Sequence, residues 1–378
     1  MMSDFDGAFR FGTLALRLMN RFREDPKALV TVYGVFYHIK KPILDAFNPT
    51  LQAYYLAFSQ GDLTFAGQAS ITHVFLRYVA GAPLNIIVDD IFSFCEQLKS
   101  YNQKMVWDLF VILQRSCLEL TNRSDEIVRL TGRIFDDDSA FESFINESTE
   151  SKGMFQHYLH TFPCRFYLGD MRSALKCAKY CWQDNGLQGA YALVIEYFLF
   201  SALVSLEHWK TLENPVSRHR YWLLFRKFHR NLESWTTKGN PNTGHLVKLL
   251  HAEFLATRKH GNPDEIKSFF DMSIARANRA GFLHNAALAN ERAGLYFFGN
   301  QKDMYWARHY LGRAKCLYAD WGAIAKVSQM EAIYGPHADS EMSEFQRSVL
   351  IAGRSRQDMI TRVDTLRLRP RNSLTGMI

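Results

Sequence analysis

The chain has 378 residues, of which 47% are apolar, 14% aromatic and 22% charged. This apolar content excludes a disordered chain, because burial of so much apolar surface can offset the entropy lost on folding. Only 22 Gly and 10 Pro are present, too few for a turn-dense all-β sandwich. The net charge of +7 is uneven: residues 1–150 carry 14 basic and 19 acidic side chains, and the remainder carries 31 and 19.

The N-terminus and the cysteines indicate a reducing compartment. Residues 1–18 contain Asp4 and Asp6 and lack the basic start and clean apolar core of a signal peptide. The 6 cysteines are sparse and lie within apolar helical sequence, unlike those of a small disulfide-rich secreted domain. We therefore expect a cytoplasmic protein.

Helical periodicity runs through nearly every long segment, and one small turn recurs between the predicted helices. It occurs as Gln60-Gly61-Asp62, Leu168-Gly169-Asp170, His260-Gly261-Asn262 and Phe298-Gly299-Asn300. In each, Gly can end the first helix in a left-handed conformation, and Asp or Asn can cap the second. Two of these glycines are 38 residues apart, near the period of tetratricopeptide-type helix pairs. The sequence predicts an all-α fold of antiparallel helix pairs stacked in a TPR-like right-handed solenoid.

The predicted repeat domain covers residues 1–335, and residues 336–378 read as a polar, basic linker or tail. Two polar stretches are candidate sub-boundaries within the domain. The first lies near 136–151 and begins with three consecutive aspartates, and the second is GNPNTG at 239–244.

Residues 190–206 (AYALVIEYFLFSALVSL) form the most apolar stretch, with Glu196 near its centre. A membrane span needs about 20 apolar residues, and a carboxylate at its centre costs about 2.5–3.5 kcal/mol. We therefore predict a buried core helix and no membrane span.

Residues 218–230 form the most basic aromatic run. On a helix, the aromatic side chains share one face, and Arg218, Arg226 and Arg230 lie on or beside the other. The simplest interpretation is a core-facing helix with a solvated basic back. An alternative is a docking surface for an acidic peptide, acidic membrane head groups or RNA.

In stacked helix pairs, the first helix of each pair lines the concave face that binds peptides. Here these helices are expected at about 245–259 and 284–298. Lys248, His251, Asn285 and Asn290 are the candidate partner-binding residues, and we expect them to be exposed.

The clearest single helix is predicted at 304–321, where apolar residues recur in steps of three and four. Asp303 precedes it in a capping position, and Gly322 follows as a stop signal.

Three C-terminal blocks carry a resemblance to a known family: residues 282–291 (FLHNAALANE), 307–311 (ARHYL) and 317–327 (LYADWGAIAKV). They resemble the last helix pairs of the tetratricopeptide-like segment in large multidomain sensor kinases. Phe11-Gly12, Tyr33-Gly34, Lys41-Pro42 and Ala53-Tyr54 are similar too, as is the stretch from Tyr197 to Leu203. The resemblance covers roughly residues 8–334. Those kinases carry a protein-kinase-like domain, an AAA-type ATPase, helical repeats, a GAF domain and a histidine kinase. The resemblance implies a regulatory helical scaffold with no catalytic residue in this segment.

No phosphate-binding loop, dinucleotide fingerprint, protein-kinase catalytic loop or nucleophile elbow occurs in the sequence. His157, His160 and Cys164, like Cys177 and Cys181, lack the spacing of zinc ligands and are interpreted as ordinary helix residues. We therefore predict no catalytic residue, no cofactor and no metal.

The predicted function is a non-catalytic helical scaffold for protein–protein interaction or regulation in signal transduction. The first alternative is a fragment of a sensor histidine kinase/ATPase that couples its catalytic modules, so its partners are flanking signalling domains. The second is an RNA or acidic-membrane binder through residues 218–230, although no basic cluster carries a recognised nucleic-acid motif.

Overall fold

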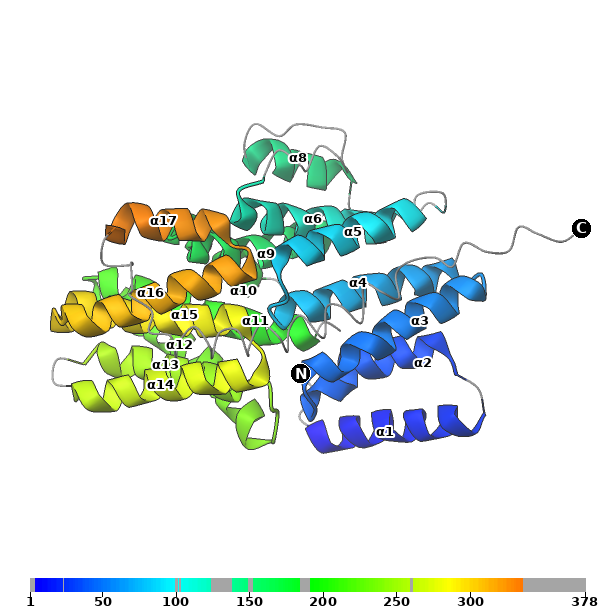
Figure 1. The fold of residues 1–378 in the computed structure, drawn as a ribbon, viewed down its shortest axis with the longest axis horizontal. Coiled ribbons are helices and arrows are strands. Elements are labelled where there is room, and N and C mark those ends of the chain that lie inside the picture. Colours follow the sequence, from blue (N-terminus) through cyan, green and yellow to red (C-terminus); the bar gives the residue numbers. More distant parts are fainter. Residues whose placement is uncertain are drawn as a thin grey trace, which may run out of the picture. The chain divides into compact units, whose positions relative to one another are not determined.

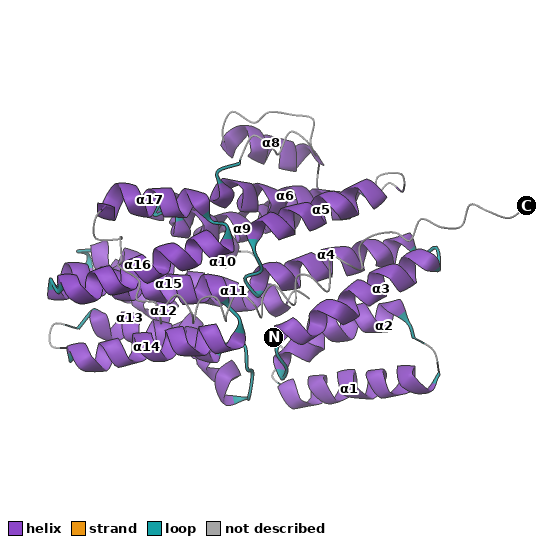
Figure 2. Cartoon of the chain, viewed as in Figure 1, coloured by secondary structure: helices purple, strands orange, loops and turns teal. Residues whose placement is uncertain are grey.

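The computed structural model describes residues 4–22, 24–98, 101, 103–123, 138–148, 152–183, 191–258 and 261–335. Within these ranges every regular element is a helix and no strand occurs, which confirms the predicted all-α class (Figure 2). The described helices belong to one compact unit, Met1–Asp339. The predicted tail, residues 336–378, lies outside the described residues, as do positions 136–137 and 149–151 of the first candidate boundary.

Short helices and turns separate the long helices, which follow one another along the chain (Figure 1). The α-helices are α1 (Phe5–Arg21), α2 (Pro26–Thr31), α3 (Phe47–Ser59), α4 (Leu63–Val79), α5 (Leu84–Leu98), α6 (Lys104–Thr121), α8 (Asp138–Ser148), α9 (Lys152–Tyr167), α10 (Met171–Gln183), α11 (Tyr191–Thr211), α12 (Pro215–Thr237), α13 (Gly244–Ala256), α14 (Pro263–Ala280), α15 (Leu283–Leu295), α16 (Met304–Trp321) and α17 (Ile324–Tyr334). Tighter or wider helical turns are η1 (Val32–Phe36), η2 (Tyr37–Ile39), η3 (Ile43–Ala46) and η6 (Tyr296–Gln301).

Helices adjacent in sequence form the most extensive contacts. Helix α3 packs on α4, α9 on α10, α11 on α12, α13 on α14, and α15 on α16. The connections within these pairs are short, so the two helices of a pair run antiparallel. Successive pairs also touch, because α12 contacts α13 and α14 contacts α15. The predicted pairing of helices is therefore present.

The predicted glycine turn is confirmed at two of its four places. Gly61 and Gly169 are left-handed, with φ of 74° and 77°, and the carboxylates of Asp62 and Asp170 each accept a backbone N–H of the next helix. At Gly261 and Gly299 the predicted left-handed glycine is wrong, because neither has a positive φ. The predicted cap after Gly261 is nevertheless confirmed, since the Asn262 side chain accepts the Asp264 backbone N–H over 3.0 Å. Gly299 lies inside the wide turn η6, and Lys302 takes the left-handed position instead, with φ of 53°.

Helix α16 begins and ends where its sequence predicts. The Asp303 carboxylate accepts the backbone N–H groups of Tyr305 and Trp306, and Gly322 ends the helix with φ of 87°. The predicted apolar positions from Ala307 to Trp321 are buried. Local signals at both ends and along the helix agree here, so no tertiary contact was needed to locate it.

Helix α11 is the buried core helix that the apolar stretch predicts. It is the single described helix long and apolar enough to cross a membrane, and 83% of that window is buried inside the protein. Helix α11 is buried because α4, α9, α10, α12 and α13 pack against it.

The charge at the centre of α11 has a partner on α15. Glu196 Oε1 lies 3.1 Å from His284 Nε2, and both side chains are buried. Burial raises the pKa of Glu196, against an opposing contribution from His284. Gly81, which ends α4 with φ of 77°, lies directly against this histidine: a Cβ at position 81 would stand 2.0 Å from His284 Nδ1.

A second charged cluster, which is partly buried and which we call the Arg292 cluster, joins α11, α13 and α15. Arg292 Nε and Nη2 donate to the two Glu253 oxygens over 2.5 and 2.7 Å, and Nη2 also contacts Glu207. Lys210 pairs with Glu207 over 2.8 Å. Burial would raise the pKa of Glu207, but Arg292 and Lys210 outweigh it and lower that pKa to about 2.

The loop at 239–244, a candidate boundary from its composition, contains three buried residues, Asn240, Asn242 and Thr243. Asn242 Oδ1 accepts the backbone N–H of Ile43 over 3.0 Å, and its Nδ2 donates to the carbonyls of His38 and Lys41 over 2.8 and 3.0 Å. Asn242 is 1% exposed. This asparagine therefore ties the loop to a segment about 200 residues earlier, and we call these three hydrogen bonds the Asn242 bridge.

Candidate functional site

Helix α1 presents an apolar stripe to solvent. Phe11, Leu14, Leu18 and Phe22 are 74%, 51%, 46% and 83% exposed. Their spacing of three, four and four residues places them on one side of the helix. We call these four residues the α1 stripe. Single exposed apolar residues are common, but a contiguous row of large ones marks an interaction surface.

Small residues explain why the large ones of α1 remain outside. The helix starts at Asp4, whose side chain accepts the backbone N–H of Gly7 over 2.8 Å. It packs through Ala8, Gly12 and Met19, which are buried. A Cβ at Gly12 would lie 3.2 Å from the Phe36 Cβ, so glycine permits close approach of α1 to η1.

Three arginines run beside the stripe. Arg10, Arg17 and Arg21 are exposed, and their spacing of seven and four residues places them on one edge of α1. Leu14 and Leu18 lie next to this edge, so the helix offers apolar and cationic contacts together. A partner segment with apolar and acidic side chains on one face would complement it.

The three predicted arginines of α12 lie on its outer side. Arg218 and Arg230 are exposed, and Arg226 is half-buried. The Arg218 guanidinium lies 4.3 Å from the centre of the Trp209 ring, and that of Arg226 lies 5.8 Å from Trp222. Two of these cations are thus held against aromatic rings.

The aromatic side of α12 faces the core, as the simpler interpretation predicts. Phe225 and Phe228 are buried, and Tyr221 and Trp222 are half-buried. Trp222 packs on Phe254 of α13, with ring centres 5.1 Å apart. Bases stack on exposed rings, so the two buried phenylalanines are not offered to a nucleic acid.

Lys248 and His251 lie together on α13. Both are half-buried, and both contact Phe269 of α14: the Lys248 Nζ is 5.0 Å and the His251 ring centre 4.4 Å from the centre of its ring. Burial, and then the charge of Lys248, lower the pKa of His251. The structure therefore brings these two predicted residues to one site.

The expected exposure of Asn285 and Asn290 is wrong. They are 4% and 2% exposed, because α15 is covered by α13, α14 and α16. Asn285 Nδ2 lies 3.1 Å from His245 Nε2, and Asn290 Nδ2 donates to the Ala286 carbonyl over 2.8 Å. These asparagines are internal side chains and do not meet a partner on the surface.

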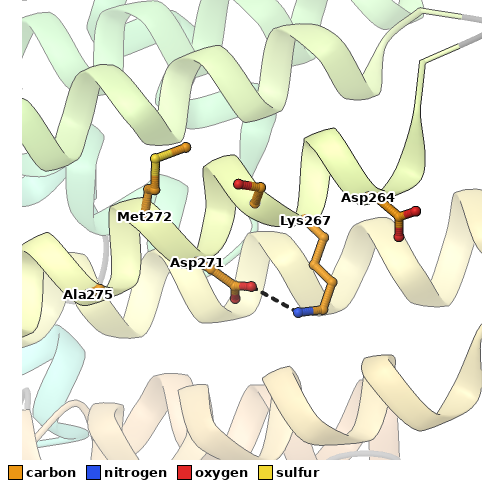
Figure 3. Close-up of a pocket in the computed structure, with 6 residues that line it drawn as sticks. Asp264, Lys267, Asp271, Met272 and Ala275 are labelled. Atoms are coloured by element: carbon orange, nitrogen blue, oxygen red, sulfur yellow. Dashed lines mark hydrogen bonds and ion pairs between the residues drawn. The ribbon is translucent and has the colours of Figure 1, made fainter.

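A depression of about 470 Å³ lies on the outer face of α14 (Figure 3). Figure 3 shows Lys267 reaching Asp271, at 2.8 Å, with Asp264 one turn away. Tyr310 also donates to Asp271 over 2.7 Å, and the Lys267 Nζ lies 4.0 Å from the Trp306 ring centre. Lys267 and Asp271 already pair with each other and with side chains of α16, so few groups in this depression remain to hold a ligand.

Sequence reasoning missed the α1 stripe, although its spacing was readable. Of its four residues, Phe11 alone was named from the sequence, as part of the family resemblance. Within the described ranges, no group of three His, Cys, Asp or Glu side chains could hold a metal ion.

No protein-family model matches the chain. The chain is 26% identical over 122 residues to the hybrid signal transduction histidine kinase G of Dictyostelium discoideum. The match covers 31% of this chain and 4% of that kinase, so the chain spans a small fraction of its relative. The predicted resemblance to a sensor kinase is thus confirmed in part, while the correspondence to a tetratricopeptide-like segment stays a prediction.

Proposed function

We propose that the chain is a non-catalytic helical scaffold in cytoplasmic signal transduction and that it binds a protein partner. The observation that carries the binding role is the α1 stripe, with four large apolar side chains each at least 46% exposed. The part in signalling rests on the similarity to a histidine kinase.

The scaffold itself is proposed to be a TPR-like right-handed stack over α11–α16. Consecutive pairing of these helices supports it, and so do contacts between the first helices of successive pairs. Helix α11 touches α13, and α13 touches α15. Such contacts between alternate helices are what a stack of pairs requires.

The proposed partner is an amphipathic protein segment whose apolar face covers the α1 stripe and whose acidic residues meet Arg10, Arg17 and Arg21. A helix that lays an apolar face on an exposed apolar row is a common recognition mode. The arginines would guide orientation and speed association, because opposite charges steer encounter.

A Phe11→Ser/Leu18→Ser variant is expected to lose the partner while it keeps the fold, because both side chains are exposed (74% and 46%). Chemical cross-linking in cells, followed by quantitative mass spectrometry, should show at least about a tenfold loss of the cross-linked partner. The peptide cross-linked to α1 should be amphipathic and acidic.

The matched control is Val216→Ser/Tyr305→Ser, which removes two large side chains outside the stripe that are at least as exposed (78% and 73%). It should retain the partner. Equal recovery with the stripe variant would contradict the proposal. The proposal would also be contradicted if the wild-type chain bound phosphatidylserine vesicles and the stripe variant did not, because a membrane would then cover α1.

The alternative is that the partners are flanking modules of one long polypeptide, and the 4% coverage of the kinase supports it. An immunoblot of lysate from cells that naturally make the protein, with an antibody against residues 282–327, distinguishes a stand-alone scaffold from a segment of a longer polypeptide. A band near the 43.8 kDa of this chain means a stand-alone scaffold. A band several times larger means a segment that couples catalytic modules.

A further inference from the structure

The end of α12, the following loop, the start of α13 and the end of α14 enclose a depression of about 390 Å³. It shares no lining residue with the depression on the outer face of α14. Its lining contains two arginines and no carboxylate. The lining residues are Thr236, Asn240, Pro241, Gly244, His245, Arg276, Arg279 and Ala280.

Both cations come from the last turns of α14. Arg276 and Arg279 are three residues apart, so they lie on one side of the helix, and both are exposed. The Arg276 guanidinium reaches across to α13: its Nη1 lies 3.3 Å from the position that a Cβ would take at Gly244. Two guanidinium groups therefore flank the start of α13.

The start of α13 itself favours an anion. The helix is 13 residues long, and no side chain caps its N-terminus. Thr243, in the capping position, directs its hydroxyl to the Thr236 Oγ1 at 2.8 Å instead. The backbone N–H groups of Leu246 and Val247 donate to the Thr243 carbonyl. The start of the helix therefore offers an anion the N–H groups of Gly244 and His245 and the positive end of the helix dipole.

Asn240 supplies an independent observation. Its side chain is 4% exposed, and its Oδ1 accepts the backbone N–H of Asn242 over 2.8 Å. That hydrogen bond fixes the orientation of the amide, so the other atom is the Nδ2 donor. This Nδ2 has no acceptor among the described groups. A buried donor without an acceptor costs free energy, and an anion in the pocket that Asn240 lines would supply the acceptor.

We propose that this pocket binds the phosphoryl group of a small phosphorylated molecule. Arg276 and Arg279 would each donate to phosphoryl oxygens, as guanidinium groups do in charge-assisted pairs. The first turn of α13 and the Asn240 amide would complete the shell. Because the pocket spans α12, α13 and α14, an occupied site links two helix pairs.

The test is titration of the full chain with inorganic phosphate at constant ionic strength, followed by calorimetry and ³¹P NMR. Wild type should bind phosphate and show no saturable response to chloride. Arg276→Gln should raise the Kd at least about tenfold, because a charge-assisted hydrogen bond is lost. Arg308→Gln, which removes an exposed arginine from α16, is the matched control and should leave Kd unchanged.

Asn240→Asp tests the buried donor. It keeps an oxygen for the Asn242 N–H but removes Nδ2 and adds a negative charge, so phosphate binding should be lost. If Asn240→Asp has a lower melting temperature than wild type, its loss of binding could reflect unfolding. The variants of the exposed Arg276 and Arg279 then decide whether the pocket binds phosphate. Phosphate binding no tighter than that of chloride, or an unchanged Kd in the Arg276→Gln/Arg279→Gln variant, would overturn the proposal.

Discussion

Gly81→Ala is expected to destabilise the protein by about 3 kcal/mol or more. A left-handed conformation costs a residue with a Cβ about 1–2 kcal/mol, and forcing extra atoms into a packed site costs about 1–3 kcal/mol. Here the added atom would lie 2.0 Å from His284 Nδ1, so the ring must move away from Glu196. Urea denaturation, with the midpoint and slope fitted together, measures the effect.

Gly61→Ala is the matched control. Gly61 has nearly the same backbone conformation, with φ of 74°, but nothing lies within 4 Å of its Cβ position. This variant should show the conformational cost alone, about 1–2 kcal/mol. Equal losses in the two variants would mean that the contact between Gly81 and His284 contributes nothing to stability.

Arg292→Met is expected to cost about 3–5 kcal/mol, a large part of the stability of an ordinary domain. The substitution removes the guanidinium that joins Glu207 and Glu253 and leaves Lys210, at 2.8 and 3.6 Å, as the remaining cation near both. The triple variant Glu207→Gln/Glu253→Gln/Arg292→Met should recover much of the loss, because the unpaired charges are gone too. Lys315→Met is the control: it removes a cation paired at 2.9 Å with the half-exposed Glu331 and should cost under about 1 kcal/mol.

Arg292→Met should also change the dependence of stability on pH. In wild type, Arg292 and Lys210 hold the pKa of Glu207 at about 2, below its ordinary 4.5, so that stability is present above pH 4.5 and is lost as pH falls toward about 2. Without Arg292, only Lys210 opposes the effect of burial, so the pKa of Glu207 rises toward its ordinary value. The slope of unfolding free energy against pH in this window should therefore weaken. An identical slope in both proteins would contradict this assignment.

Elements defined by local signals could be predicted from the sequence. Helix α16 needed only its periodicity, Asp303 and Gly322, all within the helix or beside it. The turns at Gly61 and Gly169 were predicted for the same reason. Gly299 shows the limit of this reasoning, because an apparently similar motif continues as the wide turn η6 and leaves the left-handed position to Lys302.

Burial of polar residues depends on contacts distant in sequence, and so the sequence did not reveal it. Asn285 and Asn290 look like surface residues, yet α15 has neighbours on several sides. The converse holds for α1, where Phe11 and Leu18 look like core residues but remain outside because Ala8 and Gly12 face the protein. The arginines of α12 were placed correctly because that helix has one clearly aromatic face.

The Asn242 bridge also fixes an order of events during synthesis of the chain. The peptide groups of His38, Lys41 and Ile43 emerge from the ribosome about 200 residues before the side chain that will bind them. At about 5–20 residues per second, that interval is about 10–40 s. Until then water must satisfy these groups, so the N-terminal helices reach their final arrangement only after most of the chain has been made.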